Sequence, residues 1–246
     1  MLEDLAWLGL EWETPVLRQS ENFADYEDAL ARLERMGLTY RAYLTRAEIR
    51  RFVADREAAG SPWPRDPDGA PHYPGDRAVL SAEERRWRVD ADAPFAVRLD
   101  MGRALELVGG PISWRECDAD LPPAPARTGW FDCADVPADP AAWGDVILAR
   151  KDTPTSYHLS VVVDDARQGI TDVMRGRDLF HATAVHRVLQ ILLGLPAPRY
   201  RHHRLILDHD GRKLAKSDRS TSLRDLRRAG CALEDILERI GMSSSL

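Results

Sequence analysis

The chain has no apolar run that approaches the ~18 residues needed to cross a bilayer. It also lacks the charged-then-apolar start that is typical of a signal peptide. Cysteine is scarce, and Cys117, Cys133 and Cys231 stand at scattered spacings that predict neither a disulfide framework nor a metal-binding knuckle. Together these absences favour a cytoplasmic protein with no membrane partner.

The composition is that of an ordinary globular protein, with 246 residues of which 44% are hydrophobic and 30% are charged. That length allows a sizeable core. The net charge of −6 at first argues against a nucleic-acid partner, yet residues 199–228 hold ten Arg or Lys against four Asp. A basic segment on an acidic body is typical of a face that handles phosphate or RNA. A solvated arginine-rich helix is the alternative that charge alone leaves open.

The most informative stretch is residues 202–220, HHRLILDHDGRKLAKSDRS. Residues 205–208 predict a short strand, and the Asp-His-Asp-Gly that begins at Asp208 predicts a turn. Lys213 and Lys216 follow in a loop at the carboxyl end of that strand, which is the edge where open α/β sheets bind ligands. Lysine ammonium groups there suit phosphate oxygens. By itself, the loop could equally be a solvated basic loop.

Strands and helices alternate in the second half of the chain, which predicts a parallel or mixed sheet. β-Branched side chains predict strands at 146–150, 157–163 and 170–174. We expect Asp178 to cap the next helix, which ends at Gly194.

The first half is more helical. Residues 1–10 predict a helix that begins without an N-cap, and a second helix opens at Gln19 and stops at Gly37. The apolar stripe of the second helix consists of Phe23, Tyr26, Leu30 and Leu33. A short helix over 46–56 and an irregular loop over 58–76 follow.

Three further local signals complete the pattern. Ser81 and Glu84 form a capping box before another short helix. Residues 95–101 alternate as a strand. Two final helices are expected at 222–230 and 233–240.

Two stretches together resemble one family. Residues 213–217, KLAKS, are similar to the KMSKS signature loop of class I aminoacyl-tRNA synthetases. Residues 156–179, SYHLSVVVDDARQGITDVMRGRDL, resemble the glutamate branch of that class. The resemblance runs from residue 1 to about residue 230. It is strongest to the short members without an anticodon-binding domain, which attach glutamate to queuosine in tRNA(Asp).

The resemblance implies an α/β, Rossmann-like nucleotide-binding fold in a single catalytic domain over residues 1–246. Within it, residues 40–142 would form an α+β insertion of the acceptor-binding type, and residues 218–246 a short helical tail. The implied substrates are L-glutamate, ATP and tRNA(Asp), with Mg²⁺ accompanying ATP. A monomer without an anticodon-binding domain is expected.

The resemblance also assigns site residues. Lys216 matches the second lysine of the signature loop, which contacts ATP, and Lys213 matches the first, which helps to hold the loop and the pyrophosphate leaving group. Tyr157 and Arg175 match the tyrosine and arginine that bind glutamate, through a phenolic hydroxyl and a bidentate guanidinium. From the residues alone, Tyr157 could instead be a core residue and Arg175 an ion-pair partner of a nearby aspartate. Those aspartates are Asp164, Asp165 and Asp178.

One part of the family pattern that is absent is the first strand, with Arg-Phe-Ala-Pro-Ser-Pro and a HIGH-like motif. None of the seven histidines belongs to a His-x-Gly-His sequence. We therefore expect the chain to lack the first strand of its nucleotide fold and to be impaired in glutamate activation as given. The alternatives are a glutamyl-tRNA synthetase and a non-catalytic remnant that binds RNA or nothing.

The other absent part is a zinc site, which in many relatives is Cys-x-Cys followed later by Tyr-x3-Cys. Here Ala42, Leu44 and Arg77 replace the cysteines and only Tyr73 remains. Because these three side chains are not zinc ligands, we predict that elemental analysis of the purified protein will show well under one zinc per chain. Stoichiometric zinc that survives dialysis would contradict this prediction.

Overall fold

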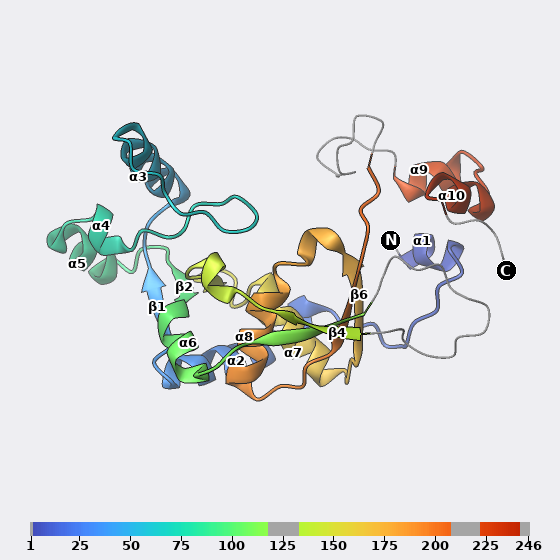
Figure 1. Ribbon diagram of the computed structural model, residues 1–246, viewed down its shortest axis with the longest axis horizontal. Helices are drawn as coiled ribbons and strands as arrows, with labels where there is room; N and C mark the ends of the chain where they lie inside the picture. Colours follow the sequence, from blue (N-terminus) through green and yellow to red (C-terminus); the bar gives the residue numbers. More distant parts are fainter. Residues whose placement is uncertain (1, 118–132, 208–221, 242–246) are drawn as a thin grey trace. The chain divides into compact units, whose positions relative to one another are not determined.

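The computed structural model describes residues 2–117, 133–207 and 222–241. The chain divides into two compact units (Figure 1). The larger comprises Gln19–His203, and the smaller comprises Met1–Arg18 together with Arg204–Leu246. Among the helices in the described residues, none has the length and apolar character to cross a membrane.

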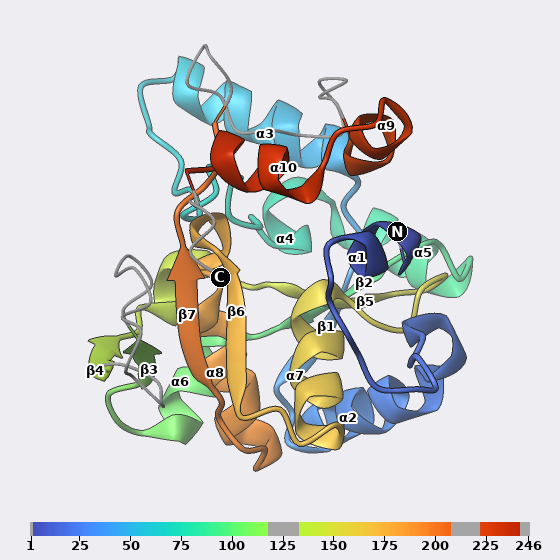
Figure 2. The same cartoon turned by 90° about the vertical axis from the view of Figure 1, so that its right-hand side faces the viewer.

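The larger unit contains a four-stranded mixed sheet with the order β4-β3-β7-β6. Its strands are β3 (Ser113–Cys117), β4 (Cys133–Pro137), β6 (Asp172–Gly176) and β7 (Arg199–His203). Strand β7 runs parallel to both β3 and β6, whereas β3 and β4 are antiparallel (Figure 2). The β6–β7 register places Arg175 beside His202. The last residues of these two strands therefore meet at one edge of the sheet.

A second, antiparallel sheet has the order β1-β2-β5. Its strands are β1 (Thr39–Ala42), β2 (Ala96–Leu99) and β5 (Ile147–Arg150). Three helices are inserted in the chain between β1 and β2 and lie next to one another in Figure 1. They are α3 (Arg46–Ala58), α4 (Asp76–Val79) and α5 (Ala82–Asp90). Both α3 and α5 begin with a complete capping box, and the box formed by Ser81 and Glu84 was predicted from the sequence.

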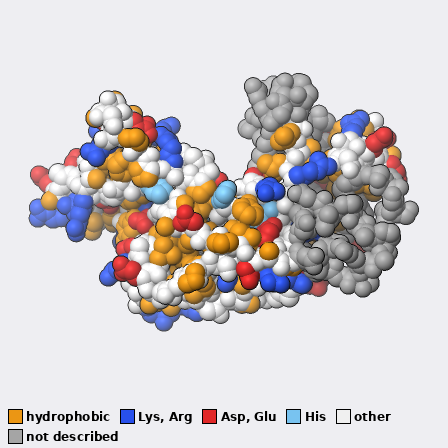
Figure 3. All heavy atoms as spheres, viewed as in Figure 1, with side chains coloured by type: hydrophobic (Ala, Val, Ile, Leu, Met, Phe, Trp, Pro, Cys, Tyr) orange, Lys and Arg blue, Asp and Glu red, His pale blue; other side chains and the backbone are white. Residues whose placement is uncertain are grey.

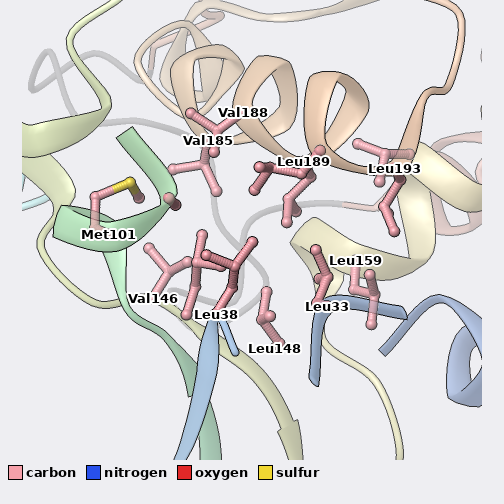
Figure 4. Packing of buried hydrophobic residues seen from close by; sticks show 14 of the residues in the cluster. Leu33, Leu38, Met101, Val146, Leu148, Leu159, Val185, Val188, Leu189 and Leu193 are labelled. Atoms are coloured by element: carbon pink, nitrogen blue, oxygen red, sulfur yellow. The ribbon is translucent and has the colours of Figure 1, made fainter. Parts of the chain in front are cut away.

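The hydrophobic core lies among four helices and the strand ends. The helices are α2 (Phe23–Arg35), α6 (Met101–Val108), α7 (Tyr157–Arg167) and α8 (Thr183–Leu193). From α8, the fully buried Val185, Val188 and Leu189 point toward Met101 and Leu148 (Figure 4). Burying each such side chain contributes about 1.5–3 kcal/mol. Helix α8 is therefore held firmly, and the polar residues that it carries are fixed in position.

The prediction of a strand at 157–163 is wrong, because these residues begin helix α7. Ser156 caps the helix, accepting a hydrogen bond from the backbone N–H of Leu159 at 3.4 Å. Leu159 and Val162, three residues apart, are both buried. This helical spacing of the buried positions, together with the cap, overrides the β-propensity of the three consecutive valines.

Three other boundaries differ from the sequence prediction. The strand expected at 205–208 is instead β7 at Arg199–His203, a polar segment whose buried residues, Tyr200 and His202, alternate with more exposed ones. The strand expected at 95–101 stops at Leu99, because Asp100 caps helix α6 with its side chain. Asp178 does not cap α8 but lies in the 3₁₀ turn η3 (Arg177–Leu179), five residues before Thr183, the first residue of that helix.

The cysteine prediction is also wrong, since Cys117 and Cys133 form a disulfide. The antiparallel register of β3 and β4 places the two residues directly opposite each other, with their Cα atoms 4.1 Å apart. Spacing along the chain cannot reveal this pairing, because it depends on the strand register. Disulfides persist mainly in oxidising compartments, so this bond does not favour a cytoplasmic location.

The remaining predicted elements are confirmed, with shifts of a few residues at their ends. The predicted helix after Gln19 is a 3₁₀ turn η1 (Gln19–Glu21) followed by α2, which buries Tyr26 and Leu33. The helices predicted at 1–10, 222–230 and 233–240 are also present, in the smaller unit. They are α1 (Leu2–Trp7), α9 (Leu223–Arg228) and α10 (Leu233–Arg239).

Hydrogen bonds connect the residues that follow β1 to α4, at the positions compared above with a zinc site. The Tyr73 hydroxyl lies 3.4 Å from the backbone N–H of Leu44, from which it accepts, and it donates to Asp76. Asp76 also accepts from the backbone N–H of Tyr43 at 3.1 Å and 3.2 Å, one contact to each carboxylate oxygen. Among the described residues no group of three or more His, Cys, Asp or Glu could hold a metal ion. The zinc content stays a prediction.

The loop that precedes α4 is held by His72. Its Nε2 lies 2.9 Å from the carbonyl oxygen of Ala142, in the 3₁₀ turn η2 (Pro140–Trp143), and its own carbonyl accepts from the Trp63 indole at 2.9 Å. Gly144, at a positive φ of 57°, packs against the His72 ring so closely that a Cβ would lie 3.0 Å from it. A hydrogen bond and a steric contact thus fix this loop.

Asp76 offers a test of how the inserted helices are held. We predict that Asp76→Ala will lower the free energy of unfolding by about 1–3 kcal/mol, because two half-buried donors lose their acceptor. Urea unfolding followed by circular dichroism measures the change. Asp55→Ala, on the exposed surface of α3, is the matched control and should be nearly neutral. Equal midpoints for both variants would contradict the role given to Asp76.

Candidate functional site

Arg175, near the carboxyl end of β6, is the centre of a hydrogen-bonded cluster. Its Nε donates to Nε2 of His202 at 3.0 Å, as the β6–β7 register allows. From helix α8, the Thr183 hydroxyl accepts from Nη2 at 2.7 Å and Nδ1 of His186 accepts from Nη1 at 3.1 Å. The first turn of α8 and the neighbouring strand therefore hold three sides of one guanidinium.

The two remaining N–H groups of Arg175 make longer contacts. Nη1 lies 3.4 Å from the Tyr157 hydroxyl, and Nη2 lies 3.3 Å from the carbonyl oxygen of Leu179. The guanidinium carbon also lies 5.0 Å from the centre of the Tyr200 ring, in a cation–π contact. Every one of these partners is neutral, so the hydrogen bonds orient the Arg175 charge without neutralising it.

None of the three aspartates that the sequence offered as partners, all of them described residues, forms an ion pair with Arg175. Asp164 accepts from the Tyr26 hydroxyl at 2.7 Å and from the Gln19 amide at 2.8 Å. Within the described ranges, no Asp or Glu oxygen lies within 4.0 Å of the Arg175 nitrogens. The ion-pair alternative for Arg175 thus has no partner in the part of the chain that the structure describes.

Tyr157 lies at the open side of this cluster. It is the first residue of α7 and is 46% exposed, which corrects the alternative that it is a core residue. Figure 3 shows histidine and hydrophobic side chains reaching the surface of the larger unit. A carboxylate that entered beside Tyr157 could accept two hydrogen bonds from Arg175, in place of the two long contacts. It could accept a third from the Tyr157 hydroxyl. The arrangement is suited to a small anion.

Two histidines, the half-buried His158 and the buried His186, extend the cluster behind Tyr157. Nδ1 of His158 lies 3.2 Å from Nε2 of His186. Burial, and then the charge of Arg175, lower the pKa of His158 to about 4 and hold the pKa of His186 well below its usual 6.5. Both rings are therefore neutral at pH 7, and neither competes with Arg175 for an anion.

On the opposite side, His202 contacts Glu116 of β3. Nδ1 of His202 lies 2.9 Å from one oxygen of Glu116 and 3.1 Å from the other. Glu116 also accepts from the backbone N–H of His202 at 3.0 Å and from the Trp114 indole at 2.9 Å. Burial acts to raise the pKa of Glu116, but these hydrogen bonds together outweigh it and lower the pKa below its usual value. Glu116 is an anion at neutral pH.

Asp165, on α7, is an acid near this cluster whose pKa is raised. Burial raises its pKa from 3.8 to about 6, with the charge of Arg175 acting against that rise and the neighbouring Asp164 adding to it. A perturbed carboxyl near a charged cluster is typical of a functional site, although structural networks perturb pKa values too.

The structure brings together two of the four predicted site residues. Tyr157 and Arg175 are in contact, whereas Lys213 and Lys216 lie outside the described residues. Sequence reasoning missed His202, His186 and Glu116. The only signal for His202 was its alternation with Tyr200, which the misplaced strand boundary concealed, and nothing in the sequence pointed to Glu116.

The family model described as the catalytic domain of class I tRNA synthetases (E and Q) matches residues 1–115 and 133–245. A glutamyl-Q tRNA(Asp) synthetase of Rhodobacter capsulatus is 43% identical over 98% of this chain and 81% of its own length. One of Nocardia farcinica is 39% identical over 96% of this chain, which spans 65% of that relative.

Solved structures show the same fold. A glutamate-tRNA synthetase from Elizabethkingia anophelis matches with a TM-score of 0.58 and 23% identity, over 93% of this chain and 42% of that one. At this identity the likeness supports the fold, and it agrees with the α/β class predicted from the sequence.

The pKa shifts of the two histidines and of Asp165 make the stability of the folded protein depend on pH in opposite directions. In the folded protein His158 and His186 resist protonation, so stability is lost as the pH falls from about 6.5 towards 4. The raised pKa of Asp165 acts oppositely, because its contribution is present at low pH and is lost as the pH rises through about 6.

Asp165→Asn should therefore raise the free energy of unfolding at pH 7 and make its loss on acidification steeper. Urea unfolding at several pH values between 4 and 7 measures both effects. Asp28→Asn, on the exposed face of α2, is the control. Parallel curves for the wild type and Asp165→Asn would show that Asp165 does not titrate as described.

Proposed function

Because this chain belongs to the catalytic-domain family of the class I glutamyl and glutaminyl tRNA synthetases, we propose that it activates glutamate with ATP and transfers it to queuosine in tRNA(Asp). The two relatives described above, both named glutamyl-Q tRNA(Asp) synthetases, support this choice over other members of the family. The observation that carries it is Arg175, whose charge is oriented by neutral partners and reaches solvent beside Tyr157.

In the proposed reaction, Arg175 and Tyr157 hold the side-chain carboxylate of glutamate. The α-carboxylate then attacks the α-phosphorus of ATP, and pyrophosphate leaves. Lys216, which matches the ATP-contacting lysine of the signature loop, would stabilise the charge that builds on the phosphoryl oxygens, and Lys213 would hold the loop and the leaving group. The neutral His158 and His186 leave the cation of Arg175 as the group that selects an acidic side chain.

Magnesium would enter this reaction with the phosphates of ATP. The described residues contain no group of three or more acidic, His or Cys side chains that could hold it, so we assign it no protein site. We also propose that residues 40–142 form the insertion that approaches tRNA and that the protein acts as a monomer. We propose a cytoplasmic location because the tRNA substrate is found there, although the Cys117–Cys133 disulfide is of a kind more common in oxidising compartments.

The experiment that tests the function uses radiolabelled glutamate and purified tRNAs. We expect labelling of tRNA(Asp) that contains queuosine, at the impaired rate that the absence of a HIGH-like motif predicts. We expect no labelling of an unmodified tRNA(Asp) transcript, which differs only in its modified bases. A glutamyl-tRNA synthetase is the second candidate, since the solved structure described above carries that name. Labelling of tRNA(Glu) at its acceptor end would favour it and contradict our proposal.

A second prediction tests the site within this function. Arg175→Ala should raise KM for glutamate by about 10-fold or more and raise KM for ATP far less, because the lost donors meet only the amino acid. Pyrophosphate exchange with each substrate varied in turn measures both constants. Arg177→Ala, on the exposed surface two residues away, is the control. If both KM values rise equally, Arg175 has a structural role.

A further inference from the structure

A continuous path of hydrogen bonds crosses three adjacent strands behind the proposed glutamate site. It runs from Arg175 on β6, through His202 on β7, to Glu116 on β3. The His202 side chain is 1% exposed and that of Glu116 is 18% exposed. Solvent therefore has little access to His202 and Glu116. The position of the ring proton on His202 is then determined by its hydrogen-bond partners in the protein.

The donors and acceptors on this path fix the tautomer of His202. An arginine can only donate, so Nε2 of His202, which faces Nε of Arg175 at 3.0 Å, must carry a lone pair. The ring proton of the neutral imidazole is then on Nδ1, where it faces the Glu116 carboxylate at 2.9 Å and 3.1 Å. The opposite tautomer would place two N–H groups against each other and direct a bare nitrogen at an anion.

Glu116 is held in place by more than the His202 ring. Its two oxygens accept from the Trp114 indole and from the backbone N–H of His202 as well as from the His202 ring. The parallel register, which pairs Glu116 with Tyr200, brings the carboxylate within reach of His202 two residues further along β7. The acceptor that sets the tautomer is thus anchored to two strands.

We propose that Glu116 is a positioning residue for Arg175 and that it acts through His202. By keeping the proton on Nδ1, Glu116 keeps Nε2 available to Arg175 Nε. The guanidinium plane is then set so that Nη1 reaches the open side at Tyr157. This inference deepens the proposed function and rests on it for the identity of the ligand, whereas the tautomer itself is a property of the protein without ligand.

The tautomer can be read directly from the ¹⁵N chemical shifts of His202 in protein labelled at histidine, with His202→Gln to assign the signal. We expect the Nδ1-protonated form in the wild type and in Glu116→Gln, whose amide oxygen can still accept. Glu116→Met, of similar length and without a hydrogen-bond acceptor of comparable strength, should shift the population toward the Nε2-protonated form. Asp135→Asn is the control, an exposed carboxylate on β4 that pairs with Arg115.

An Nε2-protonated His202 in the wild type would overturn the inference, as would an unchanged tautomer in Glu116→Met. Because Glu116→Met also leaves the Trp114 indole and a backbone N–H without their acceptor, its fold is checked by near-ultraviolet circular dichroism. If it does not fold, the decision passes to two substitutions at His202.

Those substitutions separate the two ring nitrogens. The amide of His202→Gln reaches the position of Nε2 and can still accept from Arg175, whereas that of His202→Asn reaches only the position of Nδ1. We expect the calorimetric Kd for L-glutamate to rise about 10-fold in His202→Asn and clearly less in His202→Gln. Equal effects in both variants would contradict the positioning role.

The two proposals fail in distinguishable ways. A wild-type protein that has the Nδ1-protonated His202 but binds no glutamate would refute the proposed function and leave the positioning of Arg175 by Glu116 intact. Normal glutamate binding in a protein with the opposite tautomer would do the reverse.

Discussion

The Arg175 guanidinium carries a permanent charge in a half-buried position, and moving such a charge out of water costs several kcal/mol unless hydrogen bonds replace the lost solvation. Each of its N–H groups has a neutral partner in the folded protein. Those partners come from β7, α7, α8 and the turn before α8. The requirement to solvate one cation therefore determines how these four elements meet at the end of β6.

The neighbouring histidines are neutral for a related reason. Burial lowers the pKa values of His158 and His186, and the positive charge of Arg175 lowers them further. Nδ1 of the neutral His186 then serves as a hydrogen-bond acceptor for the cation. Glu116 contacts the opposite nitrogen of the His202 ring from Arg175, so it does not cover the side on which a ligand would arrive.

The sequence was sufficient to pair Tyr157 with Arg175, even though it assigned Tyr157 to a strand. The resemblance to a family identifies functional positions along the chain, whatever local structure they adopt. The helix over Tyr157–Arg167 depends instead on a serine cap and on packing against neighbouring helices. His202 could not be found in the same way, because β7 is a polar segment whose burial comes from two flanking strands and not from its own composition. The Cys117–Cys133 bond was hidden for a related reason, since it depends on strand register. Local patterns such as the capping box at Ser81 were predicted correctly because all their interactions lie within one turn.

The contact between Gly144 and His72 has a consequence for how this protein can vary. Gly144 has a positive φ of 57°, and a Cβ there would lie only 3.0 Å from the His72 ring. Any side chain at position 144 would displace the ring that holds the loop to the Ala142 carbonyl. Two constraints therefore act on position 144, the neighbouring ring and the backbone conformation. Lineages that retain an aromatic ring at 72 should keep glycine at 144, and the positive φ should favour glycine there even where position 72 has become small.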